Sequence, residues 1–211
     1  MKINRRQFVR NLGLGTASLS MGSLISTSSC APSGDSRDKR GKVSDDDQFL
    51  FIGDDIAIAQ TEYGKVQGYL LNHVYTFLGV PYGADTSGKN RFMPPQKPEP
   101  WTDVRPAVFY GNTAPQRMEN RWPNNYGTFA DHWNYWDVSE DCLYLNVWTP
   151  GIADGKKRPV LVWLHGGGFT NGSGIEQDGY HGENISREGD IVFCPINHRL
   201  GPIGFSDLSG V

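Results

Sequence analysis

Three apolar segments in the second half of the chain place the strongest constraint on its fold. Residues 143–148 alternate β-forming side chains, whereas residues 160–164 and 191–196 are uninterrupted apolar runs. Continuous runs of this length are typical of strands that are buried on both faces, in a sheet that helices cover. The segments therefore predict an α/β protein.

Upstream of these segments, the sequence predicts a hairpin followed by loops. Residues 56–61 and 64–70 have the pattern of two strands joined by a short turn, so we expect a small N-terminal β-hairpin. Turn formers dominate residues 75–110, where we expect loops fixed by proline with few regular elements. Residues 112–138 are rich in aromatic side chains, and such a loop must cover something apolar.

The first thirty residues read as an export signal. A basic start precedes a weakly apolar stretch, residues 12–25, that is too short to span a bilayer. Residues 5–8, Arg-Arg-Gln-Phe, resemble a twin-arginine signal, and residues 27–30 loosely resemble a lipoprotein cleavage box that ends at Cys30. We expect an exported protein of the bacterial periplasm or cell surface. Cys30 either carries a lipid that attaches the protein to a membrane or is an incidental cysteine of an ordinary signal.

Composition and charge indicate where the folded domain begins and which partners are excluded. Residues 31–48 are small, polar and charged, so we expect a flexible tether between the signal at 1–30 and a folded domain at 49–211. A hydrophobic content of 37% with 12% aromatics suits a globular domain. The net charge of -3, without a basic cluster in the folded part, argues against a nucleic-acid partner.

A glycine triplet follows the second apolar run directly, in the sequence His165-Gly166-Gly167-Gly168-Phe169. Three glycines cost backbone entropy and supply no side chain for packing, so the position must need a close approach of backbone. Successive N–H groups in such a loop can stabilise the oxyanion that forms during acyl transfer, and a loop of this type is found in lipases and esterases.

Two other interpretations of the triplet are a plain flexible turn and a phosphate-binding loop. The flanking strand, histidine and aromatic residue argue against a plain turn, because they match the arrangement of esterases. A phosphate loop fails because no Gly-Lys-Ser/Thr follows, and no G-x-G-x-x-G spacing fits residues 164–174.

From about Thr61 to its end, the chain resembles the type B carboxylesterases, the family that includes cholinesterases and bacterial para-nitrobenzyl esterases. This resemblance implies an α/β-hydrolase fold, here the N-terminal portion of a mixed, mostly parallel sheet preceded by the hairpin. It also implies a carboxylic ester as substrate and no metal or organic cofactor. The motifs that carry it are residues 77–83, Arg91-Phe92, residues 139–150, residues 165–169 and residues 197–205.

The resemblance assigns roles to the glycine loop. Gly167 and Gly168 would donate their N–H groups to the oxyanion, with a third donor from the residue after a serine nucleophile. His165 and Gly166 would shape the loop, and His165 would not be the catalytic base. A buried, hydrogen-bonded structural role is also the commoner fate of a lone histidine.

Other positions follow from the same resemblance. Trp133 is a candidate for the substrate gorge, although packing over the sheet is an equal alternative, and Phe169 is a second candidate for substrate binding. Arg91 and Glu140 match a structural ion pair of the family. The family often bridges the cysteine at position 142 to a cysteine before Pro-Gln, but here Ala114 stands there, so the loop lacks this staple.

The remainder of the catalytic machinery is missing from residues 1–211. No serine has glycines two residues before and after it, so we expect no nucleophile elbow in this chain. The first hypothesis is therefore a serine esterase that is active only when its downstream part is present. The alternatives are a non-catalytic, cholinesterase-like surface protein that binds a partner, and a truncated product without function.

Overall fold

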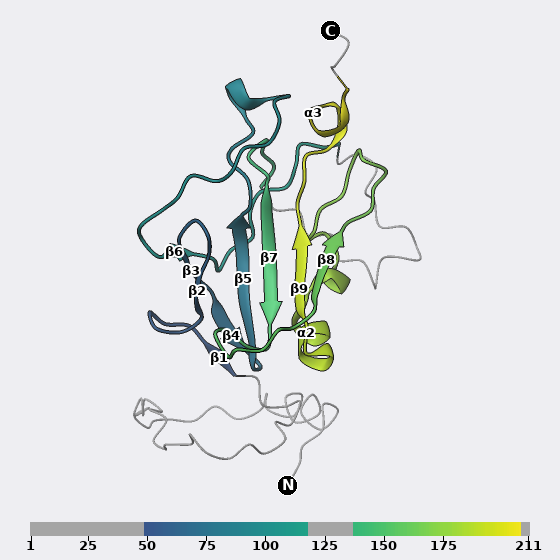
Figure 1. Ribbon diagram of the computed structural model, residues 1–211. Coiled ribbons are helices and arrows are strands. Elements are labelled where there is room, and N and C mark those ends of the chain that lie inside the picture. The colour runs from purple at the N-terminus through teal and green to yellow at the C-terminus, as the bar shows by residue number, and fades with distance from the viewer. Residues whose placement is uncertain (1–48, 118–136, 208–211) are drawn as a thin grey trace, which may run out of the picture. The chain divides into compact units, whose positions relative to one another are not determined.

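The fold is built mainly from β-strands. The computed structural model describes residues 49–117 and 137–207 (Figure 1). The expected signal at 1–30, the tether at 31–48 and Trp133 lie outside the described residues. The elements are β1 (Leu50–Phe51), β2 (Ile58–Gln60), β3 (Lys65–Gln67), β4 (Tyr69–Leu71), β5 (Val74–Pro81), β6 (Arg105–Pro106), β7 (Tyr144–Thr149), β8 (Val160–Leu164), α2 (Glu183–Gly189), β9 (Val192–Ile196) and α3 (Gly201–Phe205), with short 3-10 helices at Gly88–Asn90 and Asp178–Tyr180.

Six strands form the main sheet, in the order β1-β4-β5-β7-β9-β8. Only β8 and β9 are parallel; the other four neighbouring pairs are antiparallel. The α/β class is confirmed, but the expectation of a mostly parallel sheet is wrong for the described strands. Apolar content alone does not encode strand direction. β7 is antiparallel to both of its neighbours, β5 and β9, so most pairs in this part of the sheet are antiparallel.

A second, three-stranded sheet has the order β2-β3-β6. Its antiparallel pair β2 and β3 is the expected N-terminal hairpin, in which Ala59 pairs with Val66. The hairpin is shorter than predicted, because the second predicted strand divides into β3 and β4, which belong to different sheets.

The segment expected to consist of proline-fixed loops contains β5, the longest of the described strands. Its side chains pack on both faces of the sheet: Phe77 and Val80 belong to one buried cluster, and Val74 and Leu78 to another. The expectation failed because the many prolines and glycines that follow β5 obscured its β-forming residues. β5 joins β1 and β4 to the rest of the main sheet, since it pairs with both β4 and β7.

The helices are short, and α2 packs against β5, β7 and β9 of the main sheet. The Ser186 hydroxyl of α2 donates a 3.0 Å hydrogen bond to the carbonyl of Trp148 in β7. Trp148 is 1% exposed and packs with Phe193 of β9 in the same buried cluster. None of the helices in the described part of the chain is long and apolar enough to be a candidate membrane span.

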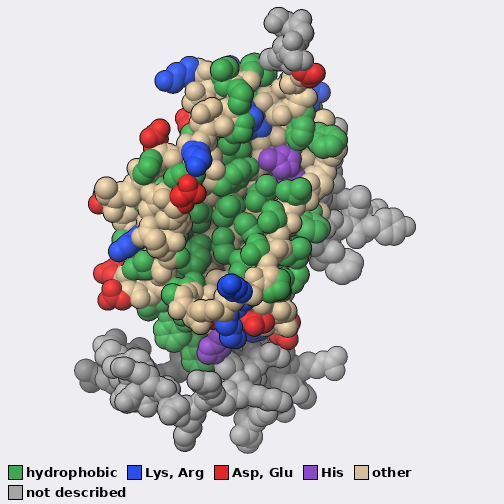
Figure 2. Space-filling view, viewed as in Figure 1, with side chains coloured by type: hydrophobic (Ala, Val, Ile, Leu, Met, Phe, Trp, Pro, Cys, Tyr) green, Lys and Arg blue, Asp and Glu red, His purple; other side chains and the backbone are tan. Residues whose placement is uncertain are grey.

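β8 contradicts the expectation that its apolar run is buried on both faces. It lies at the edge of the described sheet, and its residues are exposed, from 37% at Trp163 to 64% at Leu164. Hydrophobic side chains also gather over the middle of the face shown in Figure 2, above the central strands of the sheet. β9, by contrast, has neighbours on both sides and buries Phe193, as expected.

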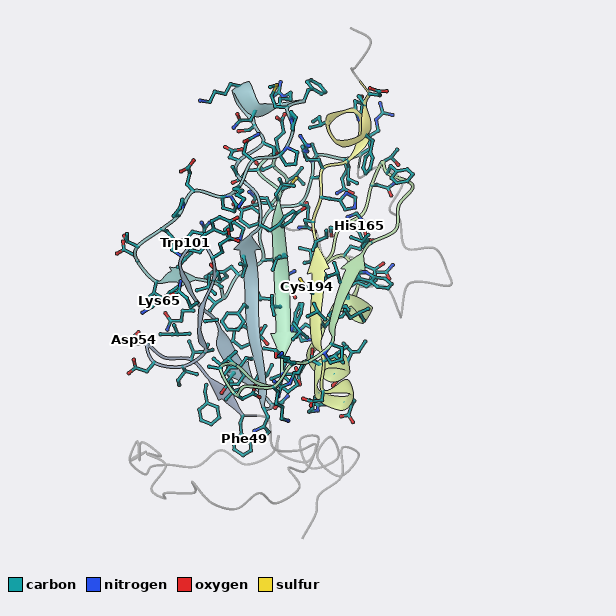
Figure 3. The ribbon with its side chains drawn as sticks, viewed as in Figure 1. Phe49, Asp54, Lys65, Trp101, His165 and Cys194 are labelled. Atoms are coloured by element: carbon teal, nitrogen blue, oxygen red, sulfur yellow. The ribbon has the colours of Figure 1, made fainter. Side chains whose placement is uncertain are left out.

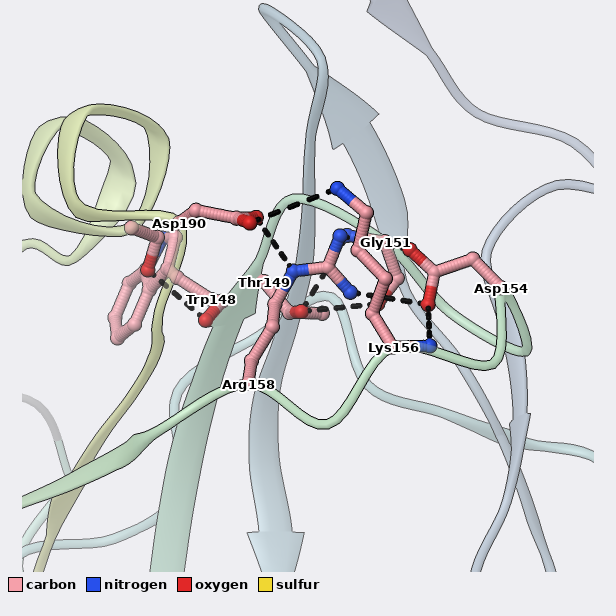
Figure 4. A network of polar contacts seen from close by, with 8 residues as sticks. Trp148, Thr149, Gly151, Asp154, Lys156, Arg158 and Asp190 are labelled. Carbon is pink, nitrogen blue, oxygen red and sulfur yellow. Dashed lines mark hydrogen bonds and ion pairs between the residues drawn. The ribbon is translucent and has the colours of Figure 1, made fainter.

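An ion-pair network holds the chain segment that precedes β8 (Figure 4). The Arg158 guanidinium, whose side chain is 7% exposed, contacts a carboxylate oxygen of Asp154 and one of Asp190, each at 2.7 Å. Asp190 caps α2 in the left-handed conformation just before β9. Arg158 therefore ties the start of β8 to the start of β9. Its hydrogen bonds lower the pKa of Asp154 to about 2.

Candidate active site

The parallel pair β8 and β9 brings the glycine loop and the segment after β9 to one edge of the sheet. Leu164 pairs with Ile196, so the chain leaves both strands side by side. His165 lies just beyond β8 (Figure 3) and is 8% exposed, although the strand before it is exposed. Because the carboxyl ends of parallel strands meet at the same edge, residues 165–175 and 197–205 lie together there.

The backbone amides of Gly167 and Gly168 donate to no acceptor among the described residues. The carbonyl groups that precede them are engaged. The Gly166 carbonyl lies 2.8 Å from Nδ1 of His165. The Gly167 carbonyl accepts from the amides of Thr170 and Asn171, at 3.2 and 3.3 Å.

These carbonyl contacts orient the two free amides. In a planar trans peptide the C=O and the following N–H point in opposite directions. The N–H of Gly167 therefore points away from the contact between the Gly166 carbonyl and His165. The N–H of Gly168 points away from the turn closed by the Gly167 carbonyl. Neither amide belongs to the ladder of β8, so both are available to a ligand.

Glycine is required at Gly167 and Gly172 for steric reasons. At Gly167 the φ angle is 122°, and an added Cβ would lie 1.8 Å from the carbonyl oxygen of Asn171. At Gly172 φ is 112°, and a Cβ would lie 2.3 Å from Nδ1 of His165. A side chain at either position would force the loop to move. At Gly166 an added Cβ would have no described atom within 4 Å, and φ is not positive. The structure therefore does not require glycine at this position of the triplet.

Two amide side chains brace the loop from outside, and no local sequence pattern predicted them. Gln116 accepts a hydrogen bond from the Gly172 amide at 2.8 Å and donates one to the Gly172 carbonyl at 3.0 Å. Asn197 accepts from the Gly174 amide at 2.8 Å and donates to the Asn112 carbonyl at 2.9 Å. Asn197 begins the motif at residues 197–205 and Gln116 follows Ala114-Pro115, but no pattern indicated which backbone groups the two side chains would hold.

Phe169 follows the glycine triplet directly and has a left-handed conformation, with φ of 66°. Such backbone is strained for a residue with a side chain, and strained residues cluster at functional sites. Its ring is 67% exposed and lies 4.8 Å from the ring of Phe205, centroid to centroid. The structure thus leaves the Phe169 ring exposed beside the glycine loop, while Trp133 lies outside the described residues.

The ion pair expected from the resemblance is present. Arg91 contacts both carboxylate oxygens of Glu140, at 2.7 and 2.8 Å. These hydrogen bonds raise the pKa of Arg91 above its ordinary value. Arg91 is half exposed, so the pair is a feature of the fold more than a source of stability.

Ala114 and Cys142 share one buried cluster, with Leu143 and Leu200. The cysteine is fully buried and unpaired, and burial raises its pKa to about 12. It is therefore an inert thiol that packs where the family often has a disulfide. Among the residues that the structure describes, no group of three or more His, Cys, Asp or Glu side chains could hold a metal ion.

A family model described as the carboxylesterase family matches residues 55–210 of the chain. The chain belongs to the carboxylesterase family. The matched range includes both strands that carry the glycine loop and the segment after β9, so the family covers the whole candidate site.

Similar proteins include hydrolases from several organisms. The chain is 44% identical over 148 residues to phenmedipham hydrolase of Pseudarthrobacter oxydans, covering 70% of this chain and 29% of the relative. It is 39% identical over 155 residues to para-nitrobenzyl esterase of Bacillus subtilis, covering 72% of this chain and 29% of the relative. A solved esterase from Clostridium hathewayi, described as hydrolysing aliphatic aromatic polyesters, matches with a TM-score of 0.69 and 38% identity, over 77% of this chain and 31% of that one.

The chain therefore spans less than a third of the length of these three relatives. The family match at residues 55–210 includes the glycine loop and its two braces, Gln116 and Asn197.

Proposed function

We propose that the complete protein hydrolyses carboxylic esters through an acyl-enzyme, with the glycine loop as its oxyanion hole. The observation that carries this proposal is the pair of free amides at Gly167 and Gly168, each oriented by the engaged carbonyl before it. Membership of the carboxylesterase family supports the same chemistry.

In this mechanism a serine oxygen attacks the ester carbonyl, and the carbonyl oxygen gains a negative charge. Gly167 and Gly168 stabilise that charge through their N–H groups, because the loop holds these groups in place before the reaction begins. One such donor contributes about 3 to 4 kcal/mol to transition-state stabilisation in serine hydrolases. The serine, its base and the orienting carboxylate would come from sequence beyond residue 211.

Two measurements test the proposal in the complete protein. We expect hydrolysis of a short-chain para-nitrophenyl ester, and loss of that activity after treatment with a fluorophosphonate, with one phosphonyl group on a serine by mass spectrometry. A complete protein without a reactive serine, or one that binds but does not cleave esters, would instead indicate the non-catalytic, partner-binding alternative.

We further propose that residues 1–211 alone are inactive. The exposed apolar side chains of the edge strand β8 support this proposal, since an exposed apolar edge is where further polypeptide pairs with a sheet or covers it. Assaying purified residues 31–211 beside the complete protein decides the point, and measurable ester hydrolysis by the shorter protein would refute it.

The expected export remains a proposal that rests on the first thirty residues. Cell fractionation of the native protein should find it outside the cytoplasm, and replacing Arg5 and Arg6 with Lys should block a twin-arginine route. Labelling with a fatty-acid analogue should mark the wild type but not a Cys30→Ala variant if the cysteine is lipidated. An unlabelled wild type would leave Cys30 as part of an ordinary signal.

A further inference from the structure

A second histidine, His198, packs against the buried histidine of the glycine loop. The imidazole rings of His165 and His198 are stacked, with centroids 4.4 Å apart and planes inclined by 3°. This contact follows from the pairing of β8 with β9, because His165 comes one residue after Leu164 and His198 two residues after Ile196. The proposed hydrolysis does not itself assign a role to His198.

His165 is connected to the Gly167 amide through one peptide group. Nδ1 of His165 lies 2.8 Å from the Gly166 carbonyl, and a carbonyl can only accept, so the ring must carry its proton on Nδ1 for this hydrogen bond. The carbonyl of Gly166 and the amide of Gly167 belong to the same rigid plane. A rotation of the His165 ring would therefore release the plane that aims the Gly167 N–H.

The contacts of the His165 ring with described residues include one at its edge and one on its face. The backbone at Gly172 lies against the Nδ1–Cε1 edge of the ring, and Gln116 holds Gly172 through two hydrogen bonds. His198 covers a face of the ring. A contact at the edge of a ring opposes its translation but not its tilt, whereas a parallel ring on its face opposes tilting. The stacked His198 therefore fixes the plane of the His165 ring.

His198 is itself well placed to act as a fixed support. Its Nδ1 lies 3.0 Å from the Arg199 carbonyl, and the ring of Phe205 meets it edge to face at 5.8 Å, with planes at 88°. The Gly201 amide donates a 2.7 Å hydrogen bond to the Phe169 carbonyl, so the same segment also holds the far end of the triplet.

We propose that His198 is a positioning residue for the oxyanion hole. Its ring fixes the plane of His165, and through the Gly166–Gly167 peptide it fixes the direction of the Gly167 N–H. This inference rests on the proposed function, because it concerns the same loop. His198 then affects the transition state and has little effect on binding of the ground-state ester, since the oxyanion exists only in the former.

The test compares three variants in the complete protein with a para-nitrophenyl ester. His198→Ala removes the ring, and we expect kcat to fall by about 10-fold or more while KM stays within about 2-fold, because small misplacements of a catalytic donor have large effects on rate. His198→Phe keeps a flat ring and should restore most of kcat. His73→Asn removes an exposed histidine at the turn between β4 and β5 and serves as the matched control.

The outcomes separate the inference from the proposed function. A wild-type protein without esterase activity overturns both. An active wild type whose His198→Ala variant keeps its kcat, or changes only KM, overturns the positioning role alone. A His198→Phe variant that folds with the wild-type melting temperature but is as slow as His198→Ala also overturns it, because a flat ring would then not be sufficient.

Discussion

Replacing Gly167 with alanine should disable the oxyanion hole, because the loop cannot accept a side chain there. The added Cβ would lie 1.8 Å from the Asn171 carbonyl oxygen, and real Cβ atoms do not approach a backbone atom so closely. The φ angle of 122° is also one that residues with a Cβ rarely adopt. The loop must therefore change its conformation, and the free amides at Gly167 and Gly168 lose their direction.

The size of the effect follows from the role of the amides. Loss of one oxyanion donor lowers kcat by about 100- to 1,000-fold, or about 3 to 4 kcal/mol, and Gly167→Ala disturbs two donors, so kcat should fall by at least this much. Gly168→Ala should be milder, because no described atom lies within 4 Å of the added Cβ and only the φ of 62° opposes the change. That conformation costs about 1 to 2 kcal/mol for alanine. Gly166→Ala meets neither obstacle and is the matched control, with kcat within about 2-fold of wild type.

Steady-state kinetics of the complete protein on a para-nitrophenyl ester, with melting temperatures for each variant, would measure this series. We expect the order of kcat to be wild type and Gly166→Ala, then Gly168→Ala, then Gly167→Ala. Equal losses at all three positions, or a fully active Gly167→Ala variant that is correctly folded, would refute the geometry of the loop.

Three further predictions concern the framework of the site. Ala114→Cys should form a disulfide with Cys142, since both positions share one buried cluster, and should raise the free energy of unfolding by about 3 kcal/mol. Thiol titration and melting with and without reductant would show the disulfide, and two free thiols in the folded variant would contradict the prediction. Asp154 has a folded pKa of about 2 against an ordinary 3.8, so its ion pair with Arg158 stabilises the fold above about pH 4 and is lost as the pH falls towards 2. The melting temperature of Asp154→Asn should therefore fall less steeply over this range than that of the wild type, and parallel curves would contradict the pairing. Purified residues 31–211 should self-associate through the exposed β8, and Val162→Lys should reduce this association in size-exclusion chromatography; a monomeric wild-type segment would contradict it.

The strand pattern of the fold was predictable where the apolar runs were long. β8 and β9 and the hairpin of β2 and β3 lie where their sequence patterns indicate. β5 was missed because turn formers follow it closely, and the strand directions were missed because side-chain patterns report burial and not orientation. The exposure of β8 could not be predicted either, since burial of a strand depends on the chain segments that pack beside it.

The candidate site was predictable to the level of its motif. Three glycines after a strand indicate a backbone function, and the structure leaves the amides of Gly167 and Gly168 without an acceptor among the described residues. The braces at Gln116 and Asn197 are ordinary polar residues, and nothing in their local sequence indicates which backbone groups they reach. Long-range hydrogen bonds of this kind depend on the register of β8 and β9, which only the folded chain defines.

The most direct test of the oxyanion hole is a crystal structure of the complete protein with a trifluoromethyl ketone bound as a transition-state analogue. The nitrogen atoms of Gly167 and Gly168 should lie about 2.7 to 3.1 Å from the ketone-derived oxyanion. An oxyanion held by other groups, with these two amides turned away from it, would contradict the role proposed for the glycine loop.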